Sequence, residues 1–122
     1  MSNTAQSTSS ILRIDLNSIA NNWITLNKYS KSAECAGVLK ADAYGIGMKY
    51  VAPKLVSVGC KTFFVANIEE AVELRKIIGE KCRIIELNGP TTSTISALLA
   101  FNIIPVLNSL PQIELWKNQA KK

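Results

Sequence analysis

The segment Val38–Gly47, with the sequence VLKADAYGIG, holds the residue types best suited to covalent chemistry. Lys40 ends an apolar run, and the carboxyl ends of strands carry the active sites of parallel α/β proteins. Partial burial at such an edge disfavours the ammonium form of a lysine and leaves a free amine that is able to form a Schiff base. Tyr44 follows in the next loop, and Gly45 and Gly47 let a ligand approach the backbone closely. These residues predict a site built on the Lys40 amine.

The loop after Lys40 leads into a predicted helix that begins at Met48 and ends near Gly59. Because helix amino-termini attract anions, this helix start predicts a place for a phosphate group. The glycine spacing matches neither a dinucleotide-binding loop nor a P-loop, so a nucleotide is not indicated. A purely structural role stays open, since strand-end lysines commonly extend to solvent and tyrosines commonly pack with their hydroxyl in water.

The amino-acid composition excludes several classes of catalyst. The sequence has no histidine, which removes Ser/His/Asp and Cys/His nucleophile systems and every metal site with a histidine ligand. Its three cysteines, Cys35, Cys60 and Cys82, are widely spaced and form no CxxC pair, so we expect reduced, partly buried thiols and no metal site. Any chemistry must therefore proceed without imidazole.

Charge and hydropathy argue against nucleic acid and membrane partners. The net charge is +5, from 14 Lys+Arg against 9 Asp+Glu, but the basic residues are dispersed and form no stripe. Residues 1–10 are polar and have no apolar run, which predicts a disordered leader ahead of a domain at 11–122. No stretch approaches the roughly 20 apolar residues of a transmembrane helix, so we expect a soluble chain in the cytoplasm.

Four short apolar runs predict the strands of a parallel sheet, because strands covered on both faces need no alternation of polar and apolar residues. They are Ala36–Leu39, Thr62–Ala66, Arg83–Leu87 and Ile103–Leu107. A segment with helical spacing follows each run. The expected helix caps are Asn67 paired with Glu70, a residue among Thr91 to Ser93, and Ser109 paired with Gln112. This alternation predicts βα units joined by right-handed crossovers.

A different piece precedes these units. The run Ile11–Leu16 alternates like a strand, and Asn17 or Ser18 is the expected cap of a helix that carries Trp23. Four βα units are about half of an eight-stranded barrel, which typically takes about 250 residues. The elements predict an α/β fold, and periodicity leaves open whether they form a small open sheet or the first part of a barrel.

The decamer around Lys40 resembles the pyridoxal-phosphate attachment motif of alanine racemases, commonly VVKANAYGHG. The resemblance extends to Ile14–Leu16 in the family's opening strand, to Phe64–Arg75 in its FAVA..EEA.ELR segment and to Ile103–Val106 in its IPVV strand. It covers nearly everything from Ile11 to Trp116. The fold that it implies is the amino-terminal half of a (β/α)8 TIM-type barrel, with about four βα units preceded by a strand and a helix.

The resemblance implies a cofactor and roles for single residues. Lys40 would bind pyridoxal 5'-phosphate covalently and, once released by substrate, act as the base on the D-alanine side. Tyr44 matches the tyrosine that contacts the cofactor phosphate, and Val38 and Leu87 fall where the family packs apolar side chains near the cofactor. The implied activity is the interconversion of L-alanine and D-alanine, which supplies D-alanine for the peptidoglycan of the cell wall. Full-length relatives are homodimers, so the resemblance implies self-association and leaves the oligomeric state of this chain open.

Two departures from the family pattern matter. Ile46 stands where the family usually has a histidine, although that side chain does not form the Schiff base. The family is roughly three times longer, as a full barrel with a second domain requires, and its second base, substrate arginine and most phosphate ligands lie beyond Lys122. We therefore expect an amino-terminal piece that is inactive alone. A non-catalytic truncated remnant and a related racemase for another amino acid, such as serine, remain alternatives.

Overall fold

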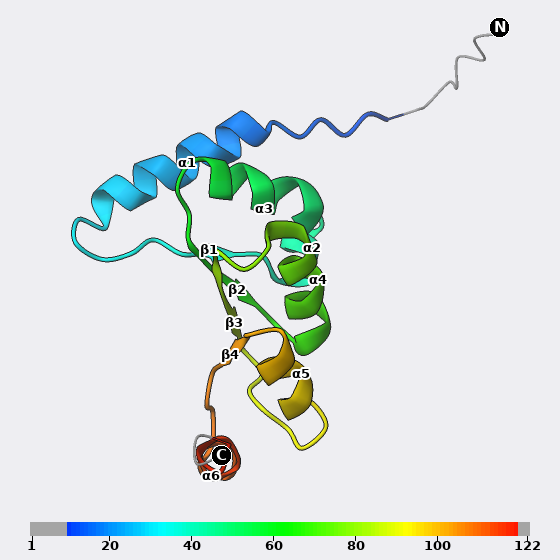
Figure 1. Cartoon of the computed structure of the whole chain (residues 1–122). Helices are drawn as coiled ribbons and strands as arrows, with labels where there is room; N and C mark the ends of the chain where they lie inside the picture. The colour runs from blue at the N-terminus through cyan, green and yellow to red at the C-terminus, as the bar shows by residue number, and fades with distance from the viewer. Residues whose placement is uncertain (1–9, 120–122) are drawn as a thin grey trace, which may run out of the picture.

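The computed structural model describes residues 10–119 and shows an α/β fold with one parallel sheet (Figure 1). The sheet has four strands in the order β1-β2-β3-β4. They are β1 (Gly37–Val38), β2 (Thr62–Val65), β3 (Arg83–Glu86) and β4 (Ile104–Pro105). Each lies inside one of the four predicted runs, so the strand predictions are confirmed. The predicted leader at 1–10 lies outside the described residues except for Ser10, which is exposed.

Helices precede the sheet and connect its strands. They are α1 (Leu16–Tyr29), α2 (Lys40–Tyr44), α3 (Met48–Ser57), α4 (Ile68–Ile78), α5 (Ile95–Ala100) and α6 (Leu110–Lys117). Figure 1 shows α3, α4 and α5 on one side of the strands, with α1 lying across α3. Among residues 10–119, no helix has the length and apolar character needed to cross a bilayer.

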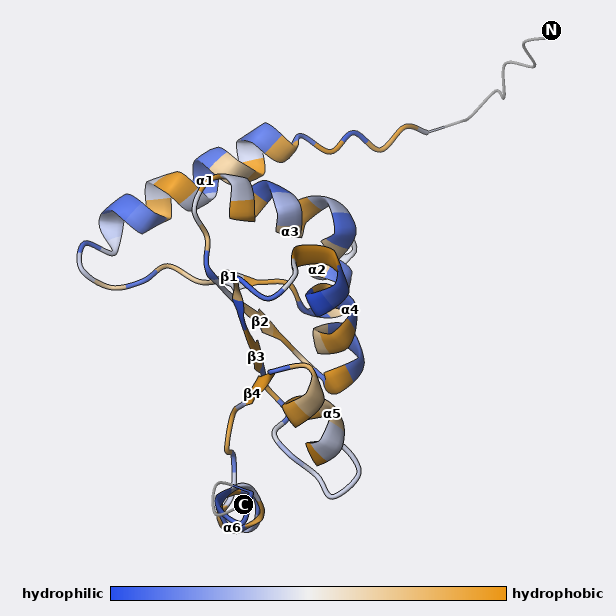
Figure 2. Cartoon of the chain, viewed as in Figure 1, coloured by the Kyte–Doolittle hydropathy of each residue, from blue (hydrophilic) through white to orange (hydrophobic). Residues whose placement is uncertain are grey.

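The two faces of the sheet differ sharply in burial. On the helix side, Phe63, Val65 and Ile84 are fully buried beneath the helices. On the other side, the strand register aligns one apolar row across all four strands: Val38, Phe64, Ile85 and Ile104. The ends of this row, Val38 and Ile104, are 45% and 44% exposed. Figure 2 shows the mostly apolar colouring of the strands. Within residues 10–119, one face of the sheet has no layer of helices.

The edge of the sheet opposite Lys40 carries a polar cluster. The Thr62 hydroxyl donates to one oxygen of the Glu34 carboxylate at 2.6 Å, and the Arg83 guanidinium forms an ion pair with the other oxygen. These hydrogen bonds lower the pKa of the exposed Glu34 carboxyl, and the bond from Thr62 has the largest effect. The cluster ties the start of β2 and β3 to the segment before β1.

A buried arginine fastens α4 to the elements that follow it. The Arg75 side chain is 4% exposed, and its guanidinium donates to the backbone carbonyls of Gly79, Cys82, Phe101 and Asn102. A buried guanidinium requires such partners, because leaving its donors unpaired costs free energy. Arg75 thus joins the end of α4, the start of β3 and the end of α5.

Predictions made at the beginning of the described chain are wrong in two respects. The run Ile11–Leu16 forms no strand, because no other strand pairs with it among the described residues, and Leu16 instead begins α1. The cap of α1 is Asp15, whose carboxylate accepts from the amides of Asn17 and Ser18 at 2.9 and 3.1 Å. A carboxylate is the stronger acceptor and also complements the helix dipole.

Of the three other predicted helix caps, two are confirmed and one is wrong. The Asn67 side chain accepts from the Glu70 amide, and the Ser109 hydroxyl from the Gln112 amide, so both of these caps are confirmed. The cap expected among Thr91 to Ser93 is wrong, since α5 begins after Thr94 without a side-chain cap. The Thr94 hydroxyl accepts instead from the Thr91 amide at 2.9 Å, which uses it in the preceding turn.

Two adjacent phenylalanines test the difference between the faces. Phe63 is fully buried on the helix side, whereas Phe64 is half-buried on the open side. We expect Phe63→Ala to lower the free energy of unfolding by about 3 to 5 kcal/mol, and Phe64→Ala by about 1 to 2 kcal/mol. Urea unfolding of the two variants measures both values. Equal losses would contradict the one-sided core.

Candidate active site

Lys40 lies at the carboxyl edge of the sheet, directly after β1 and Leu39. The Leu39 amide donates to the Phe64 carbonyl at 2.8 Å, and the Leu87 amide donates to the Val65 carbonyl at 3.0 Å. The ends of β1 and β3 are therefore held on either side of the end of β2. The Lys40 side chain itself is half-buried. Lys40 thus follows the carboxyl end of a parallel strand, which is the edge of the sheet where the sequence places it.

The sequence predicts a loop after Lys40. In the structure this segment, labelled α2, is a left-handed turn. Ala41, Asp42, Ala43 and Tyr44 have φ values between 53 and 55°, and Gly45 follows at 83°. For a residue other than glycine this conformation costs about 1 to 2 kcal/mol. Four such residues in succession therefore need support from hydrogen bonds. Nothing in the sequence signals this turn, because alanine, unlike glycine, does not favour it.

Hydrogen bonds within the segment support the turn. The Ala43 amide donates to the Leu39 carbonyl, and the Gly45 amide to the Ala41 carbonyl, each at 2.9 Å. The Asp42 carbonyl accepts from the Gly47 amide at 2.9 Å. The result is a compact reversal of the chain that begins at Lys40.

The turn brings together two of the predicted site residues. The Lys40 Nζ atom lies 6.0 Å from the centre of the Tyr44 ring, and the Tyr44 side chain is 64% exposed. Val38 and Leu87 are not in this pair. Val38 lies on the open face of the sheet, and Leu87, half-buried, follows the end of β3 on the far side of β2. The four residues share one edge of the sheet rather than one enclosed pocket.

The start of α3 is not free to receive a phosphate in the way that the sequence predicts. The Asp42 carboxylate accepts from the Met48 amide at 2.6 Å, so this amide is already bonded. The same carboxylate already complements the positive end of the α3 dipole. The expectation of an anion site at this helix start is therefore corrected, and Tyr44 is left as the predicted contact for a phosphate.

Glu70 is a site residue that the sequence predictions missed. Its position suggested only a cap of α4, yet its two carboxylate oxygens accept from the Ala41 and Ala66 amides, both at 2.7 Å. One side chain thus joins the residue after Lys40 to the residue after β2. The Ala41 partner is 29 positions away in the sequence, and no local pattern reveals it.

A second carboxylate shapes the end of β3. Glu86 is 3% exposed, and its oxygens accept from the Gly89 and Asn88 amides at 2.8 and 3.2 Å. Burial raises the pKa of the Glu86 carboxyl, and the two amide hydrogen bonds oppose this rise in part. The carboxylate fixes the tight turn that follows Leu87.

Two side chains from the last segment hold Leu87 in place. The Asn108 amide group donates to the Leu87 carbonyl at 2.7 Å, and the Gln112 amide group donates to the Asn88 carbonyl at 2.9 Å. The Gln112 carbonyl oxygen also accepts from the Asn108 backbone amide at 2.7 Å. The start of α6 thereby sets the position of a residue predicted to line the cofactor site.

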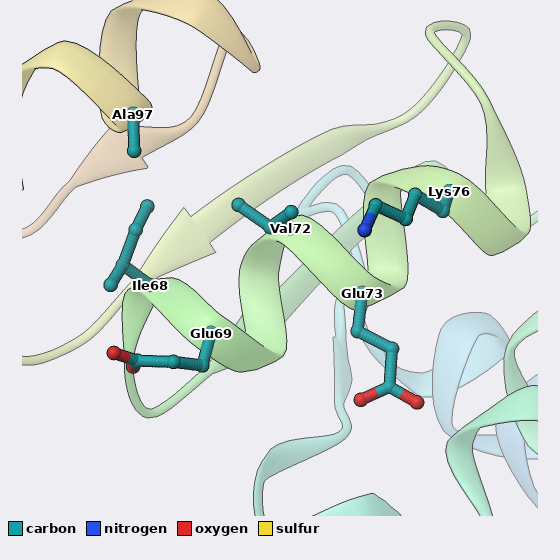
Figure 3. Close-up of a pocket in the computed structure, with 6 residues that line it drawn as sticks. All are labelled: Ile68, Glu69, Val72, Glu73, Lys76 and Ala97. Atoms are coloured by element: carbon teal, nitrogen blue, oxygen red, sulfur yellow. The ribbon is translucent and has the colours of Figure 1, made fainter.

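A groove elsewhere on the molecule does not include Lys40. It has a volume of about 490 Å³ and lies between α4 and α5 (Figure 3). Its lining residues are Ile68, Glu69, Val72, Glu73, Lys76 and Ala97. The groove is lined by none of the four predicted site residues Lys40, Tyr44, Val38 and Leu87.

Comparison with known protein families gives a match over most of the chain. The family described as "Alanine racemase, N-terminal domain" matches residues 14–122. A relative from Rhodospirillum rubrum named "Alanine racemase" is 40% identical over 107 residues. Another from Agrobacterium fabrum, named "Alanine racemase, catabolic", is 42% identical over 111 residues. These matches cover 87% and 91% of this chain but 29% of each relative.

A solved structure shares the fold of the chain. The alanine racemase of Bartonella henselae, whose structure contains covalently bound pyridoxal phosphate, superposes with a TM-score of 0.85 at 41% sequence identity. The match covers 88% of this chain and 30% of that one. The chain thus has the fold of the amino-terminal part of a barrel, as predicted, and spans less than a third of its relatives.

The contact between Asp42 and Met48 generates a stability prediction. Asp42→Ala removes the only side-chain acceptor described for the start of α3, and we expect a loss of about 1 kcal/mol in the free energy of unfolding. Asp42→Asn is the matched control, because its carbonyl oxygen still accepts from the Met48 amide. Urea unfolding distinguishes the two variants, and an alanine variant as stable as the asparagine variant would show that the contact is dispensable.

The raised pKa of Glu86 generates a pH prediction. Its folded pKa lies above the ordinary value of 4.5, so the folded state holds the proton more tightly than the unfolded state. The contribution of Glu86 to stability is therefore greatest at low pH and falls as the pH rises above 4.5. We expect the stability of the wild type to fall relative to that of Glu86→Gln as the pH rises above this value. Urea unfolding of both proteins at several pH values tests the sign, and a relative gain by the wild type would contradict it.

Proposed function

The chain belongs to the family of alanine racemase N-terminal domains, and from that premise we propose that it carries the pyridoxal-phosphate attachment site of an alanine racemase. The observation that carries this proposal is the position of Lys40, at the carboxyl edge of β1 and directly before a left-handed turn that begins at Ala41. The proposed substrate is alanine, in line with the names of the relatives.

The residues at this edge fit pyridoxal phosphate. The cofactor has an aldehyde, a phosphate and an aromatic ring. The half-buried Lys40 would supply an amine for the aldehyde, and the exposed Tyr44, whose ring centre lies 6.0 Å from the Lys40 Nζ atom, would supply a phenol for the phosphate. Val38 and Leu87 offer apolar surface from β1 and from the segment after β3. On this proposal, the chain supplies the lysine for covalent attachment and one contact for the phosphate.

The proposed role of Lys40 has two parts. Its amine holds the cofactor in place before the substrate arrives, and once free it moves a proton to or from the alanine α-carbon on one face. When bound, pyridoxal phosphate serves as the electron sink that makes this proton labile. Tyr44 orients the phosphate and so fixes the face of the substrate that Lys40 meets.

Racemisation needs a second proton carrier on the opposite face of the α-carbon. The chain spans 29% of the Rhodospirillum rubrum and Agrobacterium fabrum racemases. We propose that the polypeptide corresponding to their remaining length supplies this second carrier, and that the described residues alone attach the cofactor without racemising alanine. The half-exposed row on the open sheet face supports this proposal, because a barrel interior is normally filled by side chains.

We also propose the cytoplasm as the compartment and a small molecule, rather than a nucleic acid, as the partner. The thiols of Cys35, Cys60 and Cys82 are free, and thiols stay reduced in the cytosol. Burial raises the pKa of the Cys60 thiol to about 11, which keeps it protonated and unreactive.

The test is reductive labelling of lysines. Pyridoxal phosphate is added to the chain, borohydride fixes any attached cofactor, and peptide mapping identifies the modified residue. We expect labelling concentrated at Lys40 and lost in Lys40→Ala, with the circular dichroism spectrum unchanged. Lys49→Ala is the matched control, since Lys49 is an exposed lysine of α3 near the same loop.

The two outcomes separate the proposed function from its main alternative. Selective labelling of Lys40 that survives in Lys49→Ala supports a working cofactor site. Labelling spread evenly over many lysines, or equal labelling of Lys40→Ala, would refute the assignment and favour a non-catalytic remnant.

A further inference from the structure

We propose that Glu70 is a positioning residue for Lys40: its carboxylate fixes the backbone of the left-handed turn and so sets the reactivity of the Lys40 amine toward an aldehyde. The effect on the reactivity of Lys40 toward an aldehyde rests on the proposed function. The claim that Glu70 fixes the turn concerns only this chain. Glu70 does not touch the Lys40 amine in the structure. It acts through the peptide bond that follows Lys40.

The geometry joins three elements through one side chain. One oxygen of Glu70 accepts from the Ala41 amide and the other from the Ala66 amide, both at 2.7 Å. Ala41 begins the left-handed turn, and Ala66 follows the last residue of β2. Glu70 itself is the third residue of α4, and the Asn67 cap holds its own amide at 3.0 Å. The site lysine is therefore linked to β2 and α4 by one carboxylate.

The bond to Ala41 supports the most demanding part of the turn. Within the turn, the Ala43, Gly45 and Gly47 amides donate to backbone carbonyls of the same segment. The Ala41 amide, at the point where the chain enters the left-handed conformation, donates instead to Glu70. A bond from another element at this point fixes the direction in which the chain leaves β1, and with it the direction of the Lys40 side chain.

The chemistry of the acceptor matters as much as its position. Both partners of Glu70 are N–H donors, so the residue must accept on each of its two oxygens. A carboxylate does this, and such charge-assisted bonds are stronger than neutral ones. A glutamine of the same shape has one carbonyl oxygen and one NH2 group, which is a donor. It satisfies one amide and places a donor against the other.

The experiment compares Glu70→Gln with Glu69→Gln. Glu69 is exposed and lies in the same first turn of α4, so its variant removes the same charge from the same helix end. Amide hydrogen exchange is measured for the Ala41 and Ala66 amides and, as an internal reference, for α3 and the rest of α4. The rate of reductive labelling of Lys40 with pyridoxal phosphate is measured on the same samples.

We expect Glu70→Gln to speed exchange at one or both of these amides by about tenfold or more, with the reference helices unchanged. Lys40 labelling should slow by a similar factor relative to Lys49, which is a reference within the same chain. Glu69→Gln should leave both readouts at wild-type values. A general loss of stability would instead speed exchange in all segments.

Several outcomes would overturn the inference. Unchanged exchange at both amides in Glu70→Gln would show that Glu70 does not fix the turn. Unchanged Lys40 labelling despite faster exchange would show that the turn does not set the reactivity of Lys40. If wild-type Lys40 attaches no cofactor, the proposed function fails, and exchange alone then decides whether Glu70 holds the turn. If Glu70→Gln does not fold, Glu70→Asp replaces it. The aspartate keeps both oxygens on a stem shorter by one methylene, so at least one of the two amides should lose protection.

Discussion

Parallel sheets need cover on both faces, and among residues 10–119 the helices cover only one face of the sheet. On the covered face, Phe63 and Val65 are fully buried. On the other face, an aligned apolar row from Val38 to Ile104 is half-exposed at its ends. A closed barrel fills this space with side chains from all of its strands. The imbalance agrees with a chain that spans about 29% of its curated relatives.

The difference between the covered and the uncovered face of the sheet also determines how the candidate site is built. Lys40 and Leu87 lie at one edge of the open face, and neither lines the groove between α4 and α5. The position of Lys40 therefore depends on backbone geometry rather than on a surrounding pocket. Hydrogen bonds within the left-handed turn, the Asp42 carboxylate and the Glu70 carboxylate supply that geometry.

The sequence predicts those features that depend on interactions between residues close to one another in the chain. The four apolar runs form strands, and Asn67 and Ser109 cap their helices, because each feature depends on residues within a few positions. The alternation of Ile11–Leu16 predicts a strand that the structure lacks, since pairing depends on a distant partner that alternation does not reveal.

In the candidate site, too, the sequence predicts the local features and misses those that depend on contacts formed only in the folded chain. The sequence places Lys40 at the end of a strand correctly, because an apolar run and its polar boundary mark that position. It gives no sign of the left-handed turn, whose residues include Ala41 and Ala43. It also gives no sign that Glu70 bonds to an amide 29 positions away. Contacts made only by the folded chain determine how the lysine is held.

The most direct test of the central claim is the racemase activity of a chimera. In it, this chain replaces the matching amino-terminal part of the Agrobacterium fabrum alanine racemase, which is 42% identical to it. Exchange of the alanine α-proton with deuterated solvent is then measured for the chimera and for its Lys40→Ala variant. The account predicts exchange and racemisation in the first and neither in the second. Equal rates in the two proteins would contradict the assignment of Lys40 as the attachment residue.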